Sequence, residues 1–426
     1  MNVAQLEELL QQAQSARDAK SFREALDCYD ELLEETAGVT VDPQADPERR
    51  DYRLSALRER SRLLELMGER DEALLGYEAY YLEAGSTEHA VEALVLIGDL
   101  HGTLGRHQQA LDAYDEARHL AEAFNRTPGR AKALLGAGLT LHRLGRSEEA
   151  LSNLRQALGL FEQLDDHTGR ARTWNRLGIV HVQIGQIDRA IAAFQKALEL
   201  SREVGDRETA IELSNLGECH QQLFNMEKAL DYHRDALALA ESTQFHAVQA
   251  DLCRNLGFDL CSVGQVEEGI EYLQRALQIS EETKDRDAKL QALYSLSLAE
   301  VERGNVEAAR AYATQLKEVA EARNYRVYQA DALHALGLVH REEGNREEAE
   351  QRWQEAVFLA HDTGRQFLLW QIHSCLASIA DNPGLARVHY QIAADIINQI
   401  AYPIEDETVR GTFLNAPAVQ AILEKA

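Results

Sequence analysis

The sequence predicts an all-α protein, a right-handed superhelical solenoid of about ten helix-turn-helix repeats. The main observation is a series of small anchor residues at a nearly constant interval. The anchors are Gly98, Gly138, Gly178, Gly217, Gly257, Ser297 and Gly337. Successive anchors are 40, 40, 39, 40, 40 and 40 residues apart. Such a period indicates stacked helical units, each of which buries its apolar face against its neighbours.

Two further series of small residues follow the anchors. A second glycine comes seven residues after most anchors, and Phe224 is the exception. Twelve residues after the anchors come Ala110, Ala150, Ala190, Ala229, Gly269, Ala309 and Ala349. We expect the second glycine to end a helix in the left-handed conformation, and the other small residues to let facing helices approach closely. The helices between Pro128 and Pro383 can be uninterrupted, because no proline lies between these two.

The repeat around Gly178 carries a recognisable motif. On its first helix, Trp174, Leu177, Gly178 and His181 are spaced as i, i+3, i+4 and i+7, which is one helical face. On its second helix the same spacing continues through Ile187, Ala190, Ile191, Phe194, Ala197 and Leu198. This pattern resembles the tetratricopeptide repeat, in which aromatic, Leu-Gly and aromatic positions are followed by Ala, Phe and Ala. The same offsets recur at Leu94, Ile97, Gly98, His101, Ala110, Tyr114 and Ala117.

The resemblance extends over roughly residues 5–400, with a period of about 40 residues in place of the common 34. The proline that usually closes each unit is missing. The array is therefore similar to the long-unit repeats of Pins-type adaptors, kinesin light chains and bacterial signalling regulators. The resemblance implies a protein whose surface binds partners.

The predicted organisation is a solenoid over residues 1–400 and a C-terminal capping segment over residues 402–426. Within the solenoid we expect degenerate repeats over 1–85, regular repeats over 86–365 and a shortened last repeat over 366–401. Gly38 and Pro43 mark a loop-like insertion between residues 35 and 46. Pro417 marks the expected start of a last short helix. The stretch 396–423 resembles the segment that closes such arrays in bacterial signalling ATPases and cyclases.

The charge balance argues against two classes of partner. Lys and Arg total 44 against 71 Asp and Glu, a formal net charge of -27. Binding to nucleic acid or to an anionic membrane surface depends on cationic side chains, so neither is expected. We also find no signal peptide and no membrane-spanning stretch. The 5 cysteines are scattered, which is typical of buried thiols in a reducing cytoplasm.

No catalytic, cofactor or metal site is predicted. The sequence contains no Gly-x-x-x-x-Gly-Lys phosphate loop, no His-Glu-x-x-His zinc helix and no Gly-x-Ser-x-Gly elbow. His101, His181 and His220 lie on or beside the core face of first helices, one repeat or more apart. A metal site needs three or four converging ligands. We therefore interpret these residues as core histidines bonded to neighbours, and the chain as non-enzymatic.

The candidate binding residues flank the Leu-Gly pairs, on first helices that line the concave surface in this fold. They are Lys132, Arg143, Arg172, Asn175, Arg176, Asn215, Arg254 and Asn255. Lys and Arg can pair with carboxylates of a ligand, and asparagine amides can both donate to and accept from its backbone. Alternatively, these residues are polar only because the groove faces solvent.

Three functional hypotheses follow. The first is a scaffold that binds an extended or helical, acidic segment of a protein or peptide in the concave groove. The second is a stand-alone sensor of a bacterial signalling system, which binds a small effector or controls a separate catalytic protein. The third is an enzyme whose site is built from scattered residues, which hydrolysis screens would reveal.

Overall fold

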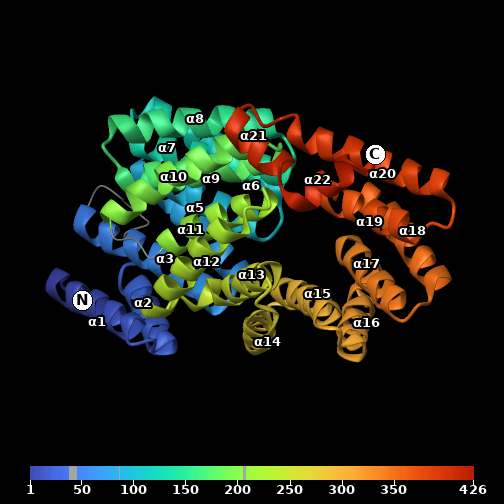
Figure 1. Cartoon of the computed structure of the whole chain (residues 1–426). Coiled ribbons are helices and arrows are strands. Elements are labelled where there is room, and N and C mark those ends of the chain that lie inside the picture. Colours follow the sequence, from blue (N-terminus) through green and yellow to red (C-terminus); the bar gives the residue numbers. More distant parts are fainter. Residues whose placement is uncertain (38–45, 86, 205–207) are drawn as a thin grey trace. The chain divides into compact units, whose positions relative to one another are not determined.

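The computed structural model describes residues 1–426 except 38–45, 86 and 205–207 (Figure 1). Every regular element in these described residues is a helix. The chain forms two compact units, unit 1 over residues 1–176 and unit 2 over residues 177–426. In the described part of the chain, no helix has the length and apolar character needed to cross a membrane. The insertion predicted at Gly38 and Pro43 lies outside the described residues.

Unit 1 consists of helix pairs, in which an odd-numbered first helix is followed by an even-numbered second helix. The helices are α1 (Val3–Asp18), α2 (Phe22–Glu35), α3 (Pro47–Met67), α4 (Arg70–Ala84), α5 (Glu88–Thr103), α6 (His107–Ala123), α7 (Thr127–Arg143) and α8 (Ser147–Gln163). Helix α9 (His167–Gln183) spans the boundary between the units. Each first helix packs on its own second helix, and α5 also packs on α7.

Unit 2 continues the same alternation and then ends in two short helices. Its helices are α10 (Ile187–Val204), α11 (Thr209–Gln222), α12 (Met226–Ser242), η2 (His246–Val248), α13 (Gln249–Ser262), α14 (Val266–Thr283), α15 (Arg286–Arg303), α16 (Val306–Ala322), α17 (Arg326–Glu342), α18 (Arg346–Asp362), α19 (Gln366–Ile379), α20 (Pro383–Ala401), α21 (Glu407–Leu414) and α22 (Pro417–Leu423). The all-α solenoid and the helix beginning at Pro417 are confirmed, whereas α21 was not predicted. The predicted division of the solenoid into degenerate, regular and shortened repeats stays a prediction.

The anchor glycines have the packing role expected from their spacing. A Cβ added to Gly178 would lie 2.5 Å from the Phe194 ring, and one added to Gly337 would overlap the Trp353 indole. Both rings come from the second helix of the same repeat and are almost fully buried. These two anchors are therefore small because the second helix inserts a large ring at this point, and Leu154 and Leu273 take that place at Gly138 and Gly257.

Candidate binding faces of the first helices

Unit 1 presents a group of cations on α7 and α9. Lys132, Arg143 and Arg172 are exposed, and Arg176 is half-buried. Lys132 forms no hydrogen bond or ion pair within the described part of the chain. Arg143 donates from Nη1 to the carbonyl oxygen of Gly102, at 3.0 Å, which ties α7 to α5 and leaves the other guanidinium nitrogens available. These are the cationic candidates of unit 1, and their role in binding stays a prediction.

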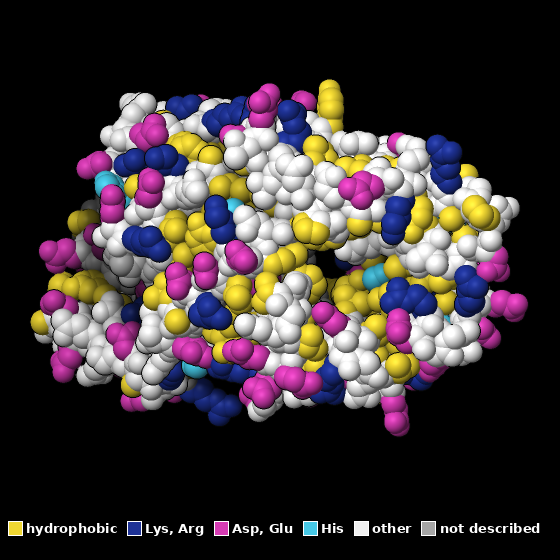
Figure 2. Space-filling view, in the orientation of Figure 1, with side chains coloured by type: hydrophobic (Ala, Val, Ile, Leu, Met, Phe, Trp, Pro, Cys, Tyr) yellow, Lys and Arg dark blue, Asp and Glu magenta, His cyan; other side chains and the backbone are white. Residues whose placement is uncertain are grey.

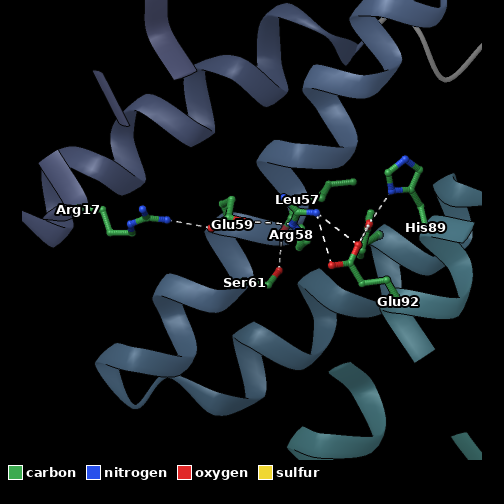
Figure 3. A network of polar contacts seen from close by, with 8 residues as sticks. Arg17, Leu57, Arg58, Glu59, Ser61, His89 and Glu92 are labelled. Carbon is green, nitrogen blue, oxygen red and sulfur yellow. Dashed lines mark hydrogen bonds and ion pairs between the residues drawn. The ribbon is translucent and has the colours of Figure 1, made fainter. Parts of the chain in front are cut away.

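The carboxylates of the neighbouring first helix in unit 1 are already bonded within the protein. The Tyr114 hydroxyl donates to Asp99 at 2.6 Å, and the Tyr80 hydroxyl donates to Glu92 at 2.9 Å. Arg58 lies 3.3 Å from Glu92 (Figure 3). Burial, followed by the adjacent carboxylates, raises the pKa of both tyrosine hydroxyls, so these groups remain donors at neutral pH.

A second set of ion pairs in the same network joins α1 to α3. Glu59 accepts from Arg17 at 3.0 Å and from Arg58 at 3.1 Å (Figure 3). Glu59 is only 8% exposed, so this carboxylate is held inside the unit. The network consequently engages acidic side chains of unit 1 in internal contacts: Glu59 is buried by them, while Asp99 and part of Glu92 stay accessible.

The predicted role of Asn255 in unit 2 is wrong. Its side chain is 0% exposed, and Nδ2 donates to Glu218 at 3.1 Å and to Ser214 at 3.5 Å. The residue before a Leu-Gly pair thus faces the preceding first helix at this position and does not face the groove. Asn175 in unit 1 is also largely buried, at 6% exposed, so the register chosen from the sequence lies partly between helices.

Arg254 and Asn215 remain as candidate donors in unit 2. Both are half-buried, and the Arg254 Nε and Asn215 Nδ2 atoms are buried without a hydrogen-bond partner. Arg254 forms no ion pair within the described residues. It lowers the pKa of the neighbouring Asp251, but burial outweighs this effect and raises that pKa above its usual value. Each of these two residues therefore holds one buried donor that no described protein atom satisfies.

Sequence analysis missed a buried polar network that links α11, α12 and α13. His233 and Asp259 are both 0% exposed, and His233 Nδ1 lies 2.6 Å from Asp259 Oδ2. The other carboxylate oxygen of Asp259 accepts from Gln221 Nε2 at 2.6 Å. A signal was present in the sequence, because His233 occupies the repeat position of Phe194 and Trp353.

A further polar pair was also missed on α15 and α17. The Tyr294 hydroxyl lies 2.9 Å from His334 Nδ1, and Arg365 lies 3.0 Å from Asp331. Burial lowers the pKa of His334 to about 4 and raises that of Asp331 to about 6, even though Arg365 acts against the second shift. Successive first helices of unit 2 are thus joined by side-chain contacts across one repeat.

The histidines singled out from the sequence do not form a metal centre. His181 is 7% exposed, and its Nδ1 lies 2.9 Å from Gln186 Oε1. His220 stacks on Tyr232, with ring centroids 5.5 Å apart. No group of three or more His, Cys, Asp or Glu side chains among the described residues is arranged to hold a metal ion.

The spacing, the paired helices and the anchor packing all have a counterpart in a known family. The family model of the tetratricopeptide repeat matches residues 89–163, 169–242 and 249–322, which together make up more than half of the chain. The chain belongs to the tetratricopeptide-repeat family. This confirms the resemblance seen in the sequence and indicates a scaffold with protein or peptide partners.

Several solved structures share the fold of this tetratricopeptide-repeat protein at low sequence identity. The apo quorum sensor NprR from B. thuringiensis is 16% identical, with TM-score 0.57 over 90% of this chain and 100% of that one. A Rap protein complexed with competence and sporulation factor is 16% identical, with TM-score 0.55 over 85% of this chain and 99% of that one.

A third similar structure is a Signal Transduction ATPase with Numerous Domains from Pyrococcus horikoshii, which has a tetratricopeptide-repeat sensor. It is 15% identical, with TM-score 0.59 over 82% of this chain and 55% of that one. This chain therefore spans about half the length of that ATPase. No curated protein sequence matches the chain.

Proposed function

We propose that this tetratricopeptide-repeat protein is a non-enzymatic scaffold that binds an acidic segment of another protein. In unit 1, Lys132, Arg143, Arg172 and Arg176 would pair with carboxylates of that segment. Unit 2, taken by itself, offers Arg254 to a ligand carboxylate and the Asn215 amide to a ligand backbone. Asn255 takes no part, and the exposed fraction of Asn175 limits it to an edge contact.

The observation that carries the proposal is the contrast between the two charge types in unit 1. Asp99, Glu92 and Glu59 each accept a hydrogen bond from a tyrosine or arginine of the protein, whereas the exposed Lys132 forms no hydrogen bond or ion pair within the described part of the chain. Lys132 together with Arg143, Arg172 and Arg176 would then form a local cationic face on a chain of net charge -27. The acidic remainder of the surface would repel anionic partners that do not fit this face.

The test is a comparison of charge-reversed variants in partner capture from source-cell lysate. Lys132→Glu/Arg172→Glu changes the face of unit 1, and Arg254→Glu changes that of unit 2. The matched control is Arg155→Glu, since Arg155 is an exposed residue on the second helix α8. Circular dichroism establishes that each variant is folded.

Two outcomes decide the proposal. A partner that binds the wild type and the control but not Lys132→Glu/Arg172→Glu, and whose binding weakens as NaCl is raised, supports an acidic ligand on unit 1. A partner retained equally by all variants contradicts it. Loss on Arg254→Glu alone would assign the site to unit 2.

A second candidate function is a stand-alone sensor for a small effector. The observation that favours it is the pair of unpartnered donors in unit 2, on Arg254 and Asn215, because two fixed donors suit a small anionic ligand. We expect a low-molecular-mass cell extract to raise the melting temperature of the wild type but not that of Arg254→Glu. An equal rise in both proteins, or none, would rule this site out.

A further inference from the structure

The C-terminal end of unit 2 folds back onto α10. Arg189 Nη2 on α10 lies 2.7 Å from both carboxylate oxygens of Glu405, a residue 216 positions later. Asp188 Oδ2 accepts hydrogen bonds from the backbone N–H groups of Glu405 and Asp406, at 3.1 and 3.0 Å. The segment that follows the last repeat is therefore attached to the first helix pair of its own unit.

The turn before α10 is part of the same contact. A Cβ added to Gly185 would lie 3.2 Å from Pro403 Cγ, so Pro403 rests directly on this turn. Nearby, Ile404 is 1% exposed and belongs to the same apolar core as Ile187. The contact thus has an apolar centre and an ionic rim.

Phe224 is the most informative residue of this contact. Six other repeats have glycine at its position, and Phe224 adopts the same left-handed conformation, with φ 55°, which is unfavourable for a large side chain. Its ring lies 5.8 Å from that of Trp370 and 6.2 Å from that of Phe413, between centroids. The unfavourable backbone is therefore offset by aromatic contacts with α19 and α21 that a glycine would not make.

The C-terminal segment depends on this contact for its structure. Helices α21 and α22 have 8 and 7 residues, and isolated helices this short are unstable in water. Phe413 and Val419 are nevertheless 0% exposed, in the core that also holds Leu223. Docking against this core consequently stabilises both short helices.

We propose that residues 402–426 are a latch that closes unit 2 on itself. The first helices α11, α13, α15, α17 and α19 follow one another between the two ends that the latch joins, and Figure 2 shows an opening in unit 2 where Figure 1 draws α13, α15, α17, α19 and α22. Docking holds α19 and α20 against the turn at Phe224, and release frees them. Any ligand of this inner face that favours one arrangement shifts the latch by its differential affinity. The latch does not rest on the acidic-ligand proposal.

The test compares Phe224→Gly with Gln244→Gly. Both replace a residue at positive φ by glycine, but Gln244, with φ 54°, is exposed and lies outside the contact. Amide hydrogen exchange of α21 and α22 is measured, together with tryptic cleavage after Arg410. In Phe224→Gly we expect exchange in these two helices to rise about tenfold, since two aromatic contacts are lost. Gln244→Gly is expected to behave as wild type.

Two results would overturn the latch. One is equal protection of α21 and α22 in Phe224→Gly and wild type. The other is loss of protection in α13–α18 together with α21 and α22, which would make the segment an ordinary part of the core. Arg189→Glu breaks the ion pair with Glu405 and should independently lower the protection of α21 and α22. The double variant Arg189→Glu/Glu405→Arg is expected to restore that protection.

Discussion

Two repeats of unit 2 hold different rings in the same place beneath their anchor glycines. Trp353 Nε1 donates to the carbonyl oxygen of His334 at 3.2 Å, and His233 Nε2 lies 3.2 Å from that of Ser214. Each carbonyl belongs to the residue three positions before the anchor, and both rings are 0% exposed. Since a carbonyl oxygen only accepts, His233 Nε2 carries a proton. One backbone arrangement therefore accommodates an indole or an imidazole.

The difference lies at the second edge of each ring. The Trp353 indole packs in an apolar cluster with Ile379, whereas His233 Nδ1 faces the Asp259 carboxylate at 2.6 Å. Ile379 and Asp259 each follow the anchor of the preceding repeat by 42 residues. The residue type at this core position therefore depends on the residue that it contacts in the next repeat, because each ring packs against both its own repeat and the next one.

The largest effect is expected from breaking the polar version of this contact. His233→Phe should lower the free energy of unfolding by about 3–5 kcal/mol, because the Asp259 carboxylate stays buried without its main partner. Urea unfolding followed by circular dichroism measures the change. His233→Phe/Asp259→Val should recover most of the loss, since Val180 and Val339 hold the equivalent position in other repeats. A single variant as stable as the wild type would contradict this account.

The next largest effect is expected from replacing the anchor glycine that each ring packs against. Gly337→Ala and Gly217→Ala place a Cβ against the Trp353 and His233 rings, and overpacking of this kind costs about 1–3 kcal/mol. The matched control is Gly159→Ala in helix α8, where a Cβ meets no atom within 4 Å. That change should stabilise the protein by about 0.5–1 kcal/mol. Thermal unfolding of the three variants distinguishes packing from helix propensity, and equal effects at all three sites would refute the packing role.

Other buried histidines of unit 2 should respond to acid. Burial lowers the pKa of His220, His334 and His373 to about 4, below the unfolded value of about 6.5. Their contribution is fully present above pH 6.5 and is lost as the pH falls from 6.5 towards 4, since only the unfolded chain then takes up the protons.

When the pH is lowered from 7 to 5.5, each of these histidines should lower the free energy of unfolding by about 1 kcal/mol. His220→Phe keeps a ring against Tyr232. This variant should therefore lose about 1 kcal/mol less of its unfolding free energy between pH 7 and pH 5.5 than the wild type does. Urea unfolding at the two pH values measures it. An unchanged pH dependence in the variant would show that His220 is not responsible.

The smallest effect is expected for an exposed pair, in contrast to the buried His233 pair. Lys196 lies 3.1 Å from Glu199 on the surface of α10. Lys196→Ala should change the free energy of unfolding by no more than about 0.5 kcal/mol, because solvent screens the charges. Thermal unfolding at low and high salt checks this, and a loss comparable to that of His233→Phe would contradict the comparison.

The helix pairs and the packing at the anchors of this protein follow from local sequence patterns. The period of the anchors, the positive-φ glycines and the 3.6-residue spacing are local, so they specify which face of each helix is buried. Lys132 and Arg172 are exposed, and their role in binding stays a prediction. Helix propensity and the steric fit at a glycine depend on residues at fixed offsets within the repeat, and the repeat pattern identifies those residues.

Which polar residues face solvent, and how the C-terminal segment packs, depends instead on contacts between distant parts of the chain. Asn215 and Asn255 share a sequence register, yet only Asn255 is completely buried, because it bonds to Ser214 and Glu218 of the preceding first helix. The Phe224 ring contacts Trp370 and Phe413, far along the chain. A repeat pattern carries no information on such long-range contacts, since closure results from the summed small rotations of many helix pairs.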